Sequence, residues 1–166
     1  MTIIDTSQSK LTLSVSGQVS LKLYDQYGNL KDARDIRNKV PLIGTTYIAN
    51  RMVSNSTDIV HYMSIGTNNT MPNEDDYKLL NQVSSRVACA YYANSSNQVT
   101  YVATFPAGNP ATQQDIVEAG LFNNPGLEPV GATLTNAMLA RTTFEPVTKL
   151  TTDSLTISWV ITISAI

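Results

Sequence analysis

The last fifteen residues of the chain, TDSLTISWVITISAI (152–166), alternate between apolar and hydroxyl-bearing side chains. The apolar positions of this alternation are Leu155, Ile157, Trp159, Ile161 and Ile163. Successive residues of a β-strand point to opposite faces, so the pattern predicts a strand with one face on a core. Strands of this half-buried kind are typical of antiparallel sheets. We expect Trp159 to be a core residue whose indole N–H needs a partner.

Similar alternation recurs along the chain, and turn residues separate the runs. The runs predict about eight or nine short strands: 11–15, 19–23, 30–36, 59–66, 86–93, 98–105, 115–123, 136–147 and the C-terminal run. Ser16-Gly17 is expected to form a hairpin turn and DQYGN (25–29) a second turn. The fold class that follows is mainly β, an antiparallel β-sandwich or jelly-roll-like barrel with one or two short helices.

Two segments have helical character. The segment VPLIGTTYIANRMV (40–53) predicts a helix over about 41–53 that lies with one face on a sheet. The apolar residues of that face recur at helical spacing: Val40, Ile43, Tyr47, Ile48 and Met52. Pro41 suits the first turn of this helix, and the small Gly44 would let it approach a neighbour closely. A second, short helix is expected near 73–80, with Asn73 as its cap and the acidic residues 74–76 in its first turn.

The length of 166 residues indicates one β-sandwich domain, residues 9–166, preceded by an N-terminal arm, residues 1–8. The opening residues lack a basic region followed by a long apolar core, so no signal peptide is expected. No apolar run approaches the roughly 18 residues of a membrane span. We therefore expect the chain to be made in a cytoplasm, with no membrane partner.

Charge is scarce in this sequence. Charged residues make up 14% of the chain, and the formal net charge is −2. An uncharged, hydrogen-bonding surface suits contacts with other proteins, because charge is depleted at interface cores. Without a basic stripe, nucleic-acid binding is not expected. Cys89 is the only cysteine, which excludes an intramolecular disulfide, and its apolar neighbours predict a buried, unreactive thiol.

Residues capable of catalysis are few and have simpler structural interpretations. His61 is the only histidine, and no G-x-S-x-G elbow accompanies it, so it is expected at a surface or interface. Glu118 lies in a predicted strand, where it would pair with Arg86 or Arg141. We therefore predict a non-enzymatic protein with no catalytic, cofactor-binding or metal-binding residues.

The order and spacing of several segments resemble a group of small tailed-bacteriophage virion proteins. The segments are YDQYGN (24–29), RNKVPLIGTTYIANRM (37–52), MSIGTNN (63–69), Arg86 before a long hairpin, DIVEAGLFN (115–123), MLARTTFEPVTKL (138–150) and SLTISWVITI (154–163). The resemblance covers nearly the whole chain. It implies a structural part of a virion that is made in the host cytoplasm, and it brings no catalytic residues.

The leading hypothesis is a capsid cement or decoration protein that stabilises the head by bridging major capsid subunits. Repeated weak contacts would gain strength from high effective concentration. A homo-oligomer is expected, and a trimer is one option. The arm is the expected subunit-interface element, and its candidate residues are Met1, Thr2, Ile3, Ile4, Asp5 and Thr6.

Two alternatives stay open. One is a neck, tail, baseplate or fibre-base component of the same kind of particle. The other is a carbohydrate-binding or receptor-binding module that uses Tyr91, Tyr92 or Tyr101 as a stacking platform. Consecutive strand residues point to opposite faces, so only one of Tyr91 and Tyr92 would line a given face.

Overall fold

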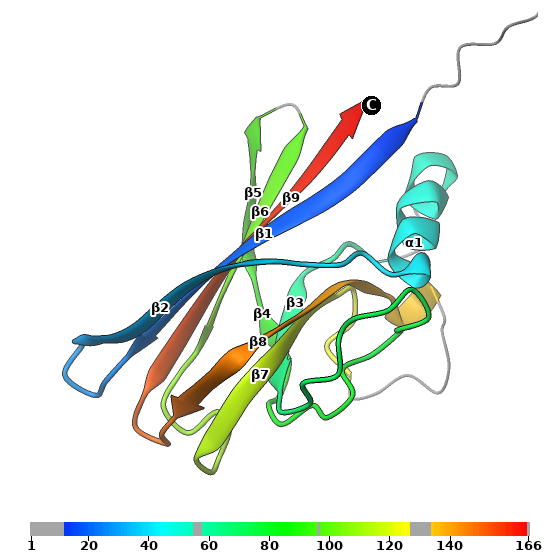
Figure 1. Cartoon of the computed structure of the whole chain (residues 1–166). Helices are drawn as coiled ribbons and strands as arrows, with labels where there is room; N and C mark the ends of the chain where they lie inside the picture. The colour runs from blue at the N-terminus through cyan, green and yellow to red at the C-terminus, as the bar shows by residue number, and fades with distance from the viewer. Residues whose placement is uncertain (1–11, 55–57, 96, 127–133, 166) are drawn as a thin grey trace, which may run out of the picture.

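The computed structural model describes residues 12–54, 58–95, 97–126 and 134–165. Within these ranges the chain forms two antiparallel sheets packed face to face, with a single α-helix at one end (Figure 1). The predicted mainly-β sandwich is confirmed. The arm, and with it the six interface candidates Met1–Thr6, lies outside the described residues.

The two sheets are built from nine described strands. The first sheet has the order β2-β1-β9-β6-β5, with the bounds β1 Leu13–Tyr24, β2 Leu30–Arg37, β5 Ala90–Ser95, β6 Gln98–Phe105 and β9 Ser154–Ala165. The second sheet has the order β4-β3-β7-β8, with the bounds β3 Tyr62–Gly66, β4 Val87–Ala88, β7 Gln114–Phe122 and β8 Met138–Lys149. A single 3₁₀ turn, η1 (Leu134–Asn136), precedes β8.

The alternating C-terminal run is the central strand of the first sheet. β9 pairs along its length with β1 on one side and with β6 on the other. Leu155, Ile157 and Trp159 are fully buried, as predicted. The expected partner of the indole N–H is missing, because Nε1 of Trp159 has no hydrogen bond among the described contacts.

The prediction of a hairpin turn at Ser16-Gly17 is wrong. β1 runs without interruption through Gly17, which pairs with Ile161 of β9. The glycine serves a tertiary contact, because a Cβ at this position would overlap the side-chain amide of Asn38. The first turn is instead the one predicted at 25–29, where the Asp25 carboxylate accepts hydrogen bonds from two backbone amides and Gly28 has φ of +83°.

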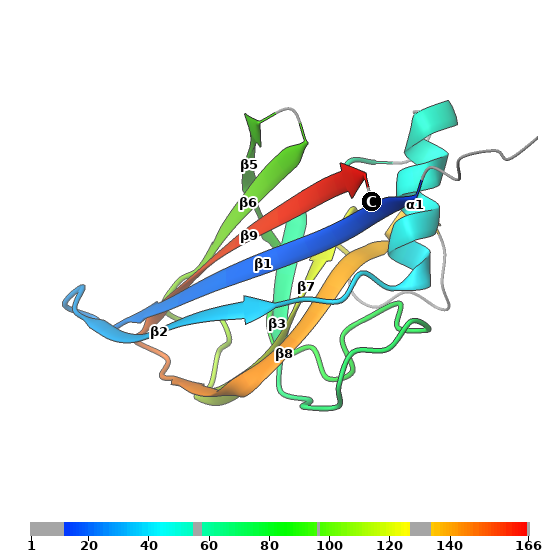
Figure 2. The same cartoon turned by 45° about the horizontal axis from the view of Figure 1, so that its top comes forward.

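Helix α1 (Leu42–Val53) begins directly after Pro41, close to the predicted bounds, and covers one end of the sandwich (Figures 1 and 2). Tyr47 is buried, and its hydroxyl donates to the carbonyl of Asp58 over 2.8 Å. A Cβ on Gly44 would lie 2.2 Å from the carbonyl oxygen of Leu139 in β8. The small residue therefore brings the helix against the strand backbone, as expected.

The segment between β3 and β4 contains no helix, so the expected helix near 73–80 is wrong. This segment forms a long irregular loop over the outer side of the second sheet (Figure 2). The side-chain Oδ1 of Asn73 does accept a hydrogen bond from the backbone amide of Asp75, as the side chain of an N-cap residue would. The turn does not continue, because the Asp76 carboxylate bonds to the Asn73 amide and to Arg141 of β8 instead.

The Gly44 contact yields a stability prediction. Gly44→Ala should destabilise the fold by about 1–3 kcal/mol through overpacking, although alanine raises helix propensity by about 1 kcal/mol. Thr45→Ala, at the exposed next position, is the matched control and should be neutral or slightly stabilising. Thermal and urea unfolding measure both effects, and a stabilising Gly44→Ala would show that the helix does not touch β8 closely.

Candidate interaction surface

A buried ion cluster joins the long loop to the second sheet. The Arg141 guanidinium donates from Nε and Nη2 to Oε2 of Glu118, over 2.9 and 2.8 Å, and from Nη1 to Oδ2 of Asp76 over 2.9 Å. Arg141 and Glu118 are fully buried and Asp76 is 7% exposed. One cation thus lies between two carboxylates, and the hydrogen bonds compensate much of the cost of removing these charges from water.

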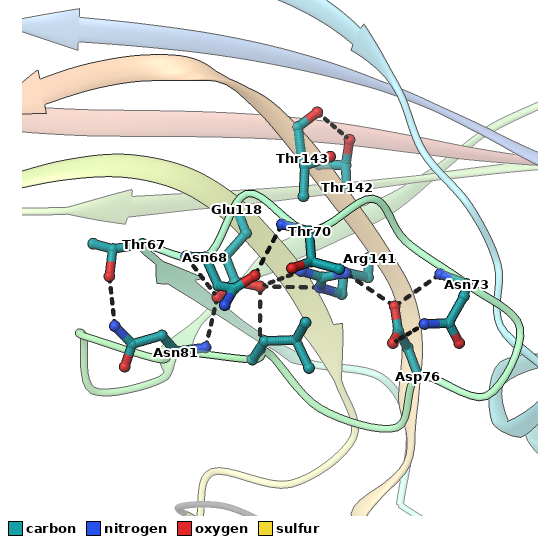
Figure 3. A network of polar contacts seen from close by, with 11 residues as sticks. Thr67, Asn68, Thr70, Asn73, Asp76, Asn81, Glu118, Arg141, Thr142 and Thr143 are labelled. Carbon is teal, nitrogen blue, oxygen red and sulfur yellow. Dashed lines mark hydrogen bonds and ion pairs between the residues drawn. The ribbon is translucent and has the colours of Figure 1, made fainter.

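Both carboxylates also accept hydrogen bonds from the loop (Figure 3). Glu118 accepts backbone amides of Asn68, Leu80 and Asn81, over 2.8 to 3.3 Å. Asp76 accepts the backbone amide and the side-chain amide of Asn73. Glu118 therefore fixes both ends of the loop, at 68 and at 80–81, while Asp76 fixes its middle. The chemical role of the cluster is to position this loop on the sheet.

The sequence prediction for Glu118 is confirmed for one of its two candidate partners, Arg141. Arg86 instead places its guanidinium carbon 3.6 Å from the ring centroid of Phe122. Its Nη1 donates to the carbonyl of Asn124 and to Oδ1 of Asn136. The role of Asp76 is not predicted from the sequence, because helix capping accounts locally for the acidic residues 74–76. No local pattern links Asp76 to an arginine 65 positions later.

The other candidate residues do not converge on one site. Cys89 is 3% exposed, and burial raises the pKa of its thiol to about 12. His61 is half-buried, and its ring meets that of Tyr62 edge-on at a centroid distance of 5.3 Å. Tyr101 is 9% exposed and belongs to the core. It therefore does not provide a surface platform, and the side chains of Tyr91 and Tyr92 are outside the described set.

Within the described ranges, no group of three or more histidine, cysteine, aspartate or glutamate side chains is placed to hold a metal ion. None of the helices in the same ranges has the length and hydropathy needed to cross a membrane.

The outward face of α1 is the most conspicuous exposed feature. Residues three or four apart along a helix lie side by side, and six such residues form what we term the outer stripe: Leu42, Thr45, Thr46, Ala49, Met52 and Val53. All six are exposed, and Leu42, Met52 and Val53 reach 63%, 77% and 86%. The stripe carries no charge. Large apolar side chains of this exposure mark contact surfaces when they cluster.

The sequence interpretation of Met52 as part of the core-facing side of the helix is wrong. Met52 and Val53, in the last turn of α1, are 77% and 86% exposed. Met52 also lines a shallow apolar hollow between the helix and the first sheet, together with Ile59 and Val99. Ile59 is itself 42% exposed, so the apolar surface continues from the stripe into this hollow.

Other large apolar residues are exposed elsewhere, but they lie at turns, loops and strand ends. They are Leu13, Tyr27, Leu30, Met71, Leu80, Leu150 and Ile163. The edge strand β2, in contrast, carries charged side chains at 31, 32, 34, 35 and 37, which discourage pairing with another strand. The outer stripe is therefore the best candidate for a contact surface in the described part of the chain.

Comparison with known proteins gives no relatives for this chain. No protein-family model, no curated protein and no solved structure matches it.

The ion cluster predicts a large cost for removing its cation. Arg141→Met should cost about 3–5 kcal/mol, because the Glu118 carboxylate remains buried without its partner. The loop should also become sensitive to trypsin after Lys78 before global unfolding occurs. Arg37→Met is the control, since Arg37 is an exposed arginine of β2, and it should change the free energy of unfolding by about 0.5 kcal/mol or less. Equal costs in urea unfolding would contradict this prediction.

Cys89 gives a prediction of reactivity. With its thiol buried and its pKa near 12, the native protein should contain almost no thiolate at pH 8. Ellman's reagent should therefore label native protein at least about 100-fold more slowly than protein unfolded in guanidinium, where the thiol pKa returns to about 8.5. Rapid, stoichiometric labelling of the native protein would show that Cys89 is accessible.

Proposed function

We propose that this chain is a non-enzymatic structural protein of a bacteriophage virion, a capsid cement or decoration protein that bridges major capsid subunits. The observation that carries the proposal is the outer stripe of α1. It presents three large apolar side chains, without charge, on a helix that packs against β8. A rigid surface of this kind suits a protein whose work is contact with other proteins.

The virion setting comes from the resemblance of the sequence to small tailed-phage structural proteins. The geometry of the described residues is compatible with that setting. Glu118, Asp76 and Arg141 hold a loop in place, so the strongest concentration of buried charge serves architecture. A neck, tail, baseplate or fibre-base component would use the same kind of surface, and copy number separates these options. A carbohydrate-binding role gains no support from Tyr101, which is buried.

The test is the location and copy number of the chain in purified particles of the phage that encodes it. Cryo-electron microscopy should place it on the capsid lattice, and quantitative mass spectrometry should find a copy number close to that of the major capsid protein. A few copies to dozens per particle would move it to the neck or tail. Absence from the particle would reject the virion function.

A matched pair of variants tests the contact surface. Met52→Lys should weaken binding to capsids by about tenfold or more, because it places a charge in an apolar contact. Tyr27→Lys changes an equally exposed residue, 80% against 77%, in the 25–29 turn and should leave binding unchanged. Pelleting of capsids with each purified variant measures the effect. Equal binding by the two variants would remove the outer stripe from the contact.

A further inference from the structure

We propose that the outer stripe of α1 packs against the same stripe of a second copy, with the two helices antiparallel about a two-fold axis. This inference deepens the proposed function and rests on it in one respect, namely that the stripe is a contact surface. It names the partner of that surface, which is another copy of this chain. The loss of capsid binding expected for Met52→Lys then comes from lost pairing between neighbouring copies on the lattice, and not from a contact of the stripe with the capsid protein itself.

The outer stripe is self-complementary in the size of its side chains. Large side chains stand at the two ends of the stripe, Leu42 at the start and Met52 and Val53 at the finish, while its middle holds Thr46 and Ala49. In an antiparallel pair centred between Tyr47 and Ile48, Leu42 lies opposite Val53 of the partner, and Thr46 lies opposite Ala49. The small residues then sit at the crossing point, where helix backbones approach most closely.

Two copies of the outer stripe do not repel each other electrostatically. A two-fold contact presents the same surface on both sides, so a stripe with charges of one sign would repel its own copy. The outer stripe has none. The one basic residue in the last turn, Arg51, is not part of the stripe and lines the same hollow as Met52 and Ile59, at the margin of the contact. Antiparallel packing also brings the positive end of one helix dipole beside the negative end of the other, which is favourable.

The area of the outer stripe suits a weak dimer. The stripe and the neighbouring Ile59 would bury on the order of 500 Å² of accessible surface on each copy, about 1,000 Å² in total, which is near the lower limit for a specific interface. The area therefore fits a weak dimer, with a dissociation constant in the micromolar range or above. In a particle, copies held close together would pair at high effective concentration. The pairing is two-fold, so it does not by itself produce the trimer that the sequence analysis raised.

The register allows a charge-swap experiment. Leu42→Glu puts a charge opposite Val53 of the partner, and Val53→Lys puts one opposite Leu42, so each single variant should raise the dimer dissociation constant about tenfold or more. The double variant Leu42→Glu/Val53→Lys places opposite charges together at both ends and should recover to within about threefold of wild type. Both positions are exposed, and the new charges suit the helix dipole, so the fold should be retained.

Sedimentation equilibrium of the full chain over a concentration series measures each constant, and circular dichroism verifies the fold of each variant. A wild-type chain that stays monomeric up to about 1 mM overturns the inference. A double variant no better than the worse single variant also overturns it, because the antiparallel register is then wrong. Tyr27→Lys serves as the control and should dimerise like wild type.

The result is separable from the test of the virion function. If the chain decorates capsids but never self-associates, the inference fails and the proposed function stands. If the chain dimerises with charge-swap recovery but is absent from particles, the pairing is supported and the virion function fails.

Discussion

The second sheet and its long loop depend on the ion pairs of the buried Arg141 guanidinium. This group joins Glu118 of β7 and Asp76 of the long loop, and the two carboxylates in turn hold the loop by accepting hydrogen bonds from backbone amides. The loop brings Leu79 over the outer side of the second sheet, against Phe122 and Met138. All three charged groups are almost fully out of water. Removal of Arg141 leaves two buried carboxylates without a cation, whereas removal of either carboxylate frees the loop amides that it accepts, so the loop and the sheet are stabilised together.

The sequence predicts this fold well where local patterns decide the structure. Two-residue alternation finds β9, and helical spacing finds α1, because burial on one face fixes the period of apolar residues. It fails at Gly17, where glycine serves a contact with Asn38 inside a continuous strand. It fails again near Asp76, because capping rules consider only residues close in sequence, whereas the carboxylate of Asp76 pairs with the distant Arg141. In both places a tertiary contact overrides the local sequence preference.

The candidate surface could be predicted only in part. Periodicity locates the helix and assigns Tyr47 to the core, where it is buried, but it assigns Met52 there too. A usable signal was present: Leu42 and Val53 lie outside the core-facing spacing, so the helix is apolar on both sides. A helix of that kind is either surrounded by its own fold or awaits a partner. Only the three-dimensional structure shows that Met52 and Val53, in the last turn of α1, stay exposed.

The way in which the sheet edges are closed directs contact toward the helix. At one open side of the sandwich, Arg34 of β2 donates to the carbonyls of Glu145 and Pro146 in β8, so one edge strand occupies acceptors of the other. The charges along β2 oppose strand addition there. The outer stripe, by contrast, is uncharged and is fixed by the fit of Gly44 against Leu139. A partner that binds it meets a preorganised surface, so the cost of ordering side chains on binding is small and lowers the affinity only slightly.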